Sequence, residues 1–94
     1  MTRYISLIKF TAKGAQDIKH STGRASAFDK AAAKAGVKID GQYWTLGAYD
    51  GVLILSASRA EKALHCLTEL VQNGYVTTET LPAFTMAEFR KIVK

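Results

Sequence analysis

The segment 47–51, with the sequence Gly-Ala-Tyr-Asp-Gly, separates two runs rich in apolar, β-branched and aromatic residues, 37–46 and 52–57. Glycine and aspartate favour tight turns, because glycine adopts left-handed backbone conformations and the aspartate side chain bonds to nearby backbone groups. The pattern predicts an antiparallel hairpin near the middle of the chain. The turn also sets an aromatic ring and a carboxylate at a strand end, so it is the strongest candidate for binding or chemistry.

Two further segments have the composition of β-strands. Residues 3–10 are apolar on both alternating sides, which is typical of a strand at the centre of a sheet. Residues 75–81 are rich in threonine and run into Pro82, and a proline belongs on an edge strand or at a strand end. Within the predicted hairpin, Asp40-Gly41 marks a possible β-bulge.

Helical patterns occupy the rest of the chain. Apolar residues recur at helical spacing over 22–35, before Gly36, and again over 59–73. Residues 58–61, with the sequence Ser-Arg-Ala-Glu, match a capping box in which the serine hydroxyl and the glutamate carboxylate satisfy the first free amides of a helix. Residues 85–88, Thr-Met-Ala-Glu, offer a second capping box for a short C-terminal helix.

The resulting order is β-α-β-β-α-β with a final helix, which predicts an α+β fold with a ferredoxin-like, four-stranded antiparallel sheet. Right-handed crossovers would set the first and third strands at its centre. Two helices cover only one face of such a sheet. Because the central strands are apolar on both faces, we expect a second copy of the chain to cover the other face.

The composition indicates one compact soluble domain over residues 1–94, with 48% hydrophobic and 22% charged residues. No apolar run is long enough to span a bilayer and no signal-peptide core follows Met1, so we expect a cytoplasmic protein without membrane contact. The lone Cys66 suits a reducing compartment and is interpreted as a small buried hydrophobe. The net charge of +5 comes from the first half, but no nucleic-acid-binding motif accompanies it. A solvated helix face is the preferred interpretation.

Several of these features together resemble the GYD domain family, named for a Gly-Tyr-Asp signature. The resemblance covers nearly the whole chain and rests on residues 43–50 (Tyr-Trp-Thr-Leu-Gly-Ala-Tyr-Asp), Arg24 and the helix start at 85–89. It implies a dimeric α/β barrel, in which two sheets pack face to face. It implies no activity, because relatives with this fold include cofactor-free monooxygenases, haem enzymes, isomerases and ligand-sensing domains.

Four residues are the candidates for ligand binding: Arg24, Trp44, Tyr49 and Asp50. The Arg24 guanidinium could hold a carboxylate or phosphate, and its place near a helix N-terminus, where the dipole disfavours cations, suggests a compensating partner. Tyr49 and Asp50 could donate and accept hydrogen bonds, or Asp50 could simply hold the turn. Of Tyr43 and Trp44, one is expected to face the helices and the other a second sheet.

Metal and cofactor sites are not expected. Glu61, His65 and Glu69 share a helix face, yet they lack the two-histidine pattern of a zinc helix. No glycine-rich phosphate loop is present, so a nicotinamide or flavin cofactor is not expected either. Catalytic residues stay unassigned.

A further hypothesis is that Arg24 and Asp50 interact directly or through one anion or water. The expectation that the first strand is a parallel partner of the third argues against it, because that would set Asp50 at the opposite end of the sheet.

The sequence therefore favours a self-associating domain, a homodimer or higher oligomer, that is structural or binds a small anionic or aromatic molecule. The alternative is a cofactor-free enzyme acting on a small organic substrate. A third hypothesis, an accessory protein that contacts nucleic acid through its basic first half, is the least favoured.

Overall fold

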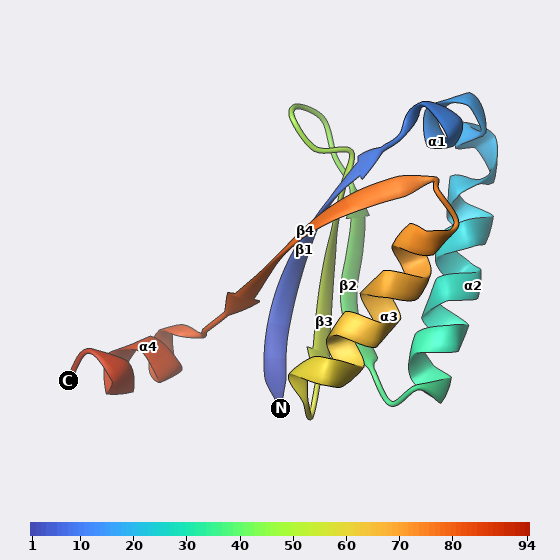
Figure 1. Ribbon diagram of the computed structural model, residues 1–94. Coiled ribbons are helices and arrows are strands. Elements are labelled where there is room, and N and C mark those ends of the chain that lie inside the picture. Colours follow the sequence, from blue (N-terminus) through green and yellow to red (C-terminus); the bar gives the residue numbers. More distant parts are fainter.

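The computed structural model describes residues 1–94 as one sheet with two long helices packed on one face (Figure 1). The strands are β1 (Thr2–Phe10), β2 (Lys38–Trp44), β3 (Gly51–Ala57) and β4 (Val76–Ala83). The helices are α1 (Ala12–Gln16), α2 (Ser21–Lys34), α3 (Ala60–Gln72) and α4 (Met86–Ile92), with a 3-10 turn at Ile18–His20. None of these helices is long and apolar enough to cross a membrane.

The strand order is β2-β3-β1-β4, and all neighbours are antiparallel. The predicted α+β class, the four-stranded antiparallel sheet and the central places of β1 and β3 are confirmed. The expectation that β1 and β3 are parallel is wrong: Ile8 at the end of β1 pairs with Gly51 at the start of β3. The α2 crossover makes β2 run parallel to β1, so the hairpin partner β3, which lies between them, must run against both.

The predicted hairpin and bulge are both present. β2 and β3 pair antiparallel, and their register shifts between Ile39 and Gly41, which leaves Asp40 as the extra residue. The connecting turn includes Gly47 at φ 101°, a left-handed conformation that glycine adopts without a steric penalty. The turn therefore fixes which residue begins β3, and with it the place of Asp50.

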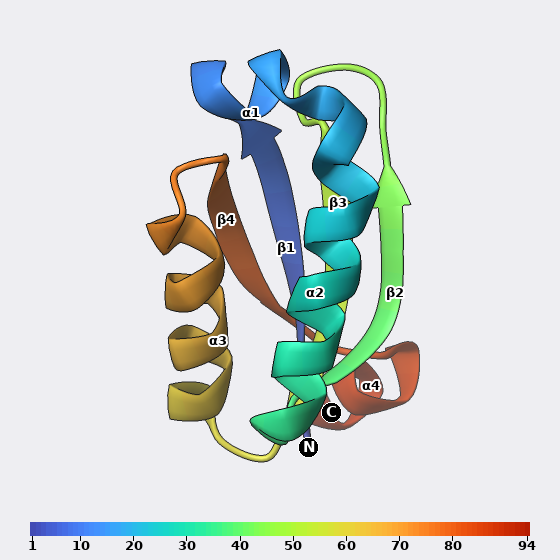
Figure 2. The same cartoon turned by 90° about the vertical axis from the view of Figure 1, so that its right-hand side faces the viewer.

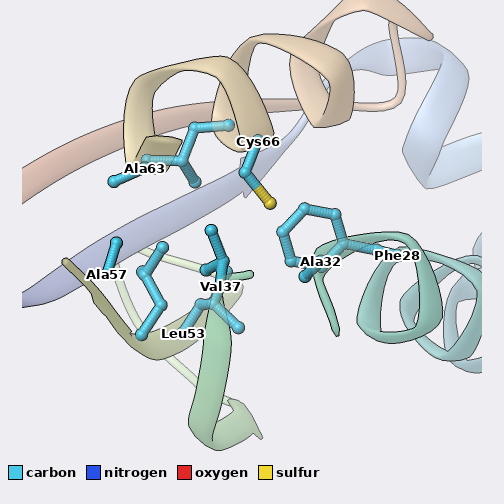
Figure 3. Packing of buried hydrophobic residues seen from close by; sticks show 9 residues of the cluster. Phe28, Ala32, Val37, Leu53, Ala57, Ala63 and Cys66 are labelled. Atoms are coloured by element: carbon cyan, nitrogen blue, oxygen red, sulfur yellow. The ribbon is translucent and has the colours of Figure 1, made fainter. Parts of the chain in front are cut away.

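The hydrophobic core lies between the sheet and its two helices (Figure 3). On the sheet side, Leu53 and Leu55 of β3 are fully buried. The helices supply small or medium-sized side chains: Phe28 and Ala32 from α2, and Ala63, Cys66 and Leu67 from α3. The expected burial of Cys66 is confirmed, and burial raises the pKa of its thiol. The core is thus dense along β3 and thinner beneath the alanines of α2.

No helix of the chain covers the other face of the sheet. α2 and α3 both lie on one side of the strands, as the two views agree (Figure 2). Strand alternation turns Ile5, Leu7, Val52 and Ile54 away from the buried Leu53 and Leu55, and these four side chains are only half-buried. We call this surface, together with Tyr43 beside it, the open face.

The helix ends match the sequence in two of three cases. Gly36 follows α2 with φ 80°, as its predicted stop position requires, and the Thr85–Glu88 capping box at α4 is complete. The predicted capping box at residues 58–61 is wrong. α3 begins one residue late, so Arg59 occupies the N-cap position without a side-chain cap, and Glu61 pairs with Arg59 instead. The four-residue motif is present in the sequence, but the helix begins one residue after the position that the motif predicts.

α4 does not pack on the domain. The end of β4 carries it away from the sheet on the side opposite α2 and α3 (Figure 1), and none of its residues is buried. Its ion pair with the domain joins Glu88 and Arg3 at 3.8 Å. The helix is well capped, so it is formed locally rather than by packing.

Candidate functional site

A cavity of about 380 Å³ opens between α2 and the end of the sheet where β1 finishes and β3 begins. Its helix wall contains Arg24, Ala25, Phe28 and Ala31, and its sheet wall contains the ends of β1 and β2. The sequence explains the space: alanines at successive turns of α2 have side chains too short to fill the gap to the sheet. The cavity is therefore a consequence of small residues on the inner face of one helix.

Arg24 reaches this cavity from the first turns of α2. Its Nη1 donates to the Asp17 backbone carbonyl at 3.0 Å and to Asp17 Oδ2 at 2.9 Å. The expectation that another interaction compensates the helix dipole is met by this Asp17 pair. Nη2 of the same guanidinium is buried and has no hydrogen-bond partner. A buried donor without an acceptor costs free energy, so Nη2 leaves this arginine with an unsatisfied hydrogen-bond donor.

The Arg24 guanidinium also stacks on an aromatic ring. Its carbon lies 4.2 Å from the centroid of the Tyr75 ring, and Lys13 Nζ lies 4.3 Å from the same centroid. Tyr75 is held by its backbone, whose carbonyl accepts from Thr11 N–H at 3.0 Å. At Gly14, an added Cβ would stand 2.0 Å from that carbonyl oxygen. Only glycine lets α1 approach so closely, and this contact positions Tyr75 behind Arg24.

Asp50 closes the opposite wall of the cavity. Its Oδ2 accepts from Phe10 N–H at 2.8 Å, and its own N–H donates to the Ile8 carbonyl at 2.8 Å. The Asp50 carbonyl accepts from Thr45 N–H at 2.9 Å. Asp50 therefore ties the ends of three strands together, and it has a definite partner rather than a fully solvated carboxylate.

Arg24 and Asp50 line the same cavity. The antiparallel pairing of β1 and β3 brings them to one end of the sheet and removes the obstacle that parallel strands would have raised. No direct hydrogen bond joins them: Arg24 is paired with Asp17, and Asp50 with Phe10.

Tyr43 and Trp44 lie on opposite faces of β2. Trp44 Nε1 donates to Ser21 Oγ on α2 at 3.0 Å, so the indole borders the cavity on the helix side. An added Cβ at Gly41 would stand 3.1 Å from the Tyr43 ring and 3.4 Å from Ile54, which sets Tyr43 on the open face. Both rings are about half exposed.

Tyr49 is separated from the cavity. Its hydroxyl donates to Glu79 Oε1 on β4 at 2.8 Å, and Glu79 is paired with Leu7 of the open face. This hydrogen bond, and then the negative charge of Glu79, raises the pKa of Tyr49. The two neighbouring residues of the signature turn thus lie on different sides of the sheet. Asp50 lines the cavity, and Tyr49 lies on the side of the open face.

The charges around the cavity are mixed. Asp17, Asp50 and Glu69 line it beside the single cation Arg24. A hydrogen bond from His20, rather than the charge of Arg24, is the largest cause that lowers the pKa of Asp17. Such a wall does not suit a multiply charged anion, because Arg24 is already paired with Asp17 and the other two carboxylates pair with no lysine or arginine.

Three contributors were not singled out from the sequence. Asp17 and Tyr75 hold Arg24, and Asp29 lies on α2 near Gln42, which lines the cavity. Asp29 Oδ1 is buried without a partner, and burial raises the pKa of this carboxyl. A carboxylate seven residues before Arg24 is the only sequence signal that pointed to Asp17.

Elsewhere, no group of three or more histidine, cysteine, aspartate or glutamate side chains is arranged to hold a metal ion. Glu61 pairs with Arg59, while His65 lies 3.2 Å from Glu69.

Comparisons with known proteins identify a family and a fold. A family model for the GYD domain matches residues 4–93. The crystal structure of FFRP-DM1 is similar with a TM-score of 0.61 at 14% identity, over 89% of this chain and 100% of that chain. The crystal structure of TTHA0845 from Thermus thermophilus is similar with a TM-score of 0.57 at 24% identity, over 90% and 95% of the two chains. None of the curated proteins matches. At these identities the structural likeness concerns the fold alone.

Proposed function

We propose that this chain, which belongs to the GYD domain family, is a small-molecule-binding domain whose ligand occupies the cavity between α2 and the sheet. The ligand class is a planar, mostly apolar molecule with one carboxylate or carbonyl oxygen. The observation that carries the proposal is Arg24, which lines the cavity and whose buried Nη2 has no hydrogen-bond partner. An acceptor oxygen on the ligand would satisfy this donor, which otherwise remains buried without a hydrogen bond.

The shape and lining of the cavity support the aromatic part of the ligand. Phe28, Trp44 and Tyr75 line a space of about 380 Å³, within the size range of small-molecule sites. Planar rings pack well against such side chains. The carboxylates of Asp17 and Asp50 favour a ligand with at most one negative charge, because a phosphate would meet repulsion on two sides.

Trp44 supplies a direct binding assay, since it is the only tryptophan in the chain and borders the cavity. Benzoate and indole-3-acetate, titrated to millimolar concentration, are expected to change its fluorescence in a saturable way, and their neutral amides to bind more weakly. Arg24→Met should weaken acid binding about tenfold or more, in line with loss of a charged hydrogen bond. Arg59→Met is the matched control, because Arg59 is exposed and pairs only with Glu61. Saturable binding that Arg24→Met leaves unchanged would contradict the role of Arg24.

Binding is favoured over catalysis by the state of Asp50. A general base takes a proton from the substrate, and a protonated carboxyl group is a weaker hydrogen-bond acceptor than a carboxylate. Oδ2 of Asp50 already accepts from Phe10 N–H and holds the strand ends together. We therefore assign the Asp50 side chain a structural role at the cavity wall rather than a catalytic one.

We also propose that the domain is ferredoxin-like and forms a dimeric α/β barrel, in which the open faces of two copies pack together. Half-buried Ile5, Leu7, Val52 and Ile54 support this, because a sheet that is apolar on both faces needs a cover on each. Tyr43 adds an aromatic ring at the edge of the same surface.

Light scattering tests the association. The wild-type chain at micromolar concentration is expected to have twice the mass of one copy, and Leu7→Asp to shift the mass toward a single copy. Lys9→Asp, an exposed position on the same face near the sheet end, is the control. A wild-type mass of one copy throughout would rule out the barrel.

A further inference from the structure

Helix α4 is an apolar helix without a cover. Its exposed large apolar residues recur three to four positions apart, and so they form one side of the helix. With the preceding Phe84, they are Phe84, Met86, Phe89, Ile92 and Val93, between 58% and 78% exposed. Ala87, Arg90 and Lys91 lie on the remaining surface. Five large apolar side chains exposed in one segment form a contiguous patch of the kind that marks an interaction site.

A second apolar surface is also uncovered. A groove runs between α3 and β4 on the helix side of the sheet, lined by Tyr4, Leu64, Val71 and Pro82 among others. Leu64 is 68% exposed although it belongs to the apolar side of α3. Two helices do not cover all four strands, so the sheet beneath β4 stays open at this edge.

The helix and the groove of one copy do not meet. β4 carries α4 to the side of the sheet opposite α3, and the ribbon views from two directions keep the two helices apart (Figures 1 and 2). α4 also has the wrong direction to fold back, because β4 continues straight into it with only Phe84 and Thr85 between them.

We propose that α4 is an exchange arm, which packs its apolar side into the α3/β4 groove of a second copy of this chain. One symmetric exchange covers both surfaces in both copies, as an isologous dimer requires. The charges agree with this occupant: α4 carries Arg90 and Lys91 in its last turn, and the only charged residue that lines the groove is acidic, Glu61, which pairs with Arg59 within its own copy. The occupied surface differs from the open face, so the arm adds a second contact between copies and does not depend on ligand binding.

The inference is tested by changing each partner surface separately. Phe89→Asp in the arm and Leu64→Asp in the groove are each expected to raise the dissociation constant of the dimer about tenfold or more, as central apolar contacts do. Both residues are exposed in one copy, so folding should be unaffected, which circular dichroism checks. Ala87→Asp and His65→Asp are the matched controls on the solvent sides of the two helices.

Mixing the two variants gives the decisive measurement. In a mixed dimer, the normal arm of the Leu64→Asp copy can enter the normal groove of the Phe89→Asp copy, so one of two contacts is restored. Analytical ultracentrifugation should therefore find more dimer in the mixture than in either variant alone. A mixture no more dimeric than its components, or a Leu64→Asp chain with wild-type affinity, would overturn the exchange. Loss of dimer in Leu7→Asp alone, with both arm and groove variants unaffected, would also overturn it and leave only the open-face interface.

Discussion

The two faces of the sheet are built from the same alternating strands but differ in how far their side chains are buried. On the helix side, Leu53 and Leu55 are completely buried, while their neighbours Val52 and Ile54 on the open face remain half-buried. These four side chains are all apolar. The difference comes from what lies above them: α2 and α3 on one side, and no helix of the same chain on the other.

This contrast separates stability from association. Leu53 and Leu55 are completely buried within one copy, so changes there alter the free energy of unfolding of the monomer. Apolar area on the open face gains most of its burial only when another molecule covers it. Substitutions on the two faces should therefore differ in which measurement they affect, and the following predictions use that difference.

The strongest effect should come from a truncation beneath the helices. Leu53→Ala should lower the free energy of unfolding by about 2–5 kcal/mol, because it leaves a cavity in the densest part of the core. Ile54→Ala, the neighbouring residue on the open face, should cost less than half as much under conditions where the chain is monomeric. Urea unfolding at low protein concentration measures both. Equal losses would mean that the two faces are equally covered.

The next effect concerns the strand ends. Asp50→Ala should lower the free energy of unfolding by about 1–3 kcal/mol, because Phe10 N–H loses its acceptor in a partly buried place. Asp50→Asn keeps an acceptor oxygen and should retain most of the stability. Thermal unfolding followed by circular dichroism compares the two variants. If both were as stable as the wild type, Asp50 would have no structural role at the cavity wall.

A smaller effect of opposite sign is expected at Asp29. Its pKa is raised by burial, so the folded chain favours the protonated form, and stability from this group is lost as pH rises through the raised pKa. Asp29→Asn should therefore be somewhat more stable than the wild type at neutral pH. The advantage should shrink as pH falls toward the ordinary pKa of aspartate. Urea unfolding of both chains at neutral pH and near the ordinary pKa of aspartate tests this. A stability difference between the two chains that does not change with pH would count against it.

The weakest effect belongs to Tyr49 on the open face. The Glu79 carboxylate accepts a hydrogen bond from the Tyr49 hydroxyl and raises the pKa of Tyr49. The contribution of this hydrogen bond to the stability of the fold is therefore full below the ordinary phenol pKa and is lost as pH rises through the raised pKa. Tyr49→Phe should lower the melting temperature slightly at neutral pH, less than Asp50→Ala does. In alkaline solution the two chains should converge. A constant difference up to high pH would show that the bond to Glu79 contributes nothing.

Local structure could be predicted from the residue pattern alone. Alternation and helical spacing predicted four strands and the long helices, Gly36 predicted the end of α2, and the Thr85–Glu88 box predicted the start of α4. Residues of the 43–50 run also carried the family resemblance that the GYD family model confirms. These features depend on groups close in the chain, whose geometry follows from backbone preferences and short-range hydrogen bonds.

Which of these groups meet depends on the tertiary structure. The antiparallel pairing of β1 with β3 brought Asp50 to the cavity of Arg24, while the preceding residue, Tyr49, reached the other face. Arg24 has two partners, Asp17 and Tyr75, which come from separate parts of the chain. Strand direction and the path of each crossover set such contacts, and a residue pattern records them only weakly because alternate side chains look alike on either face of a two-sided apolar sheet.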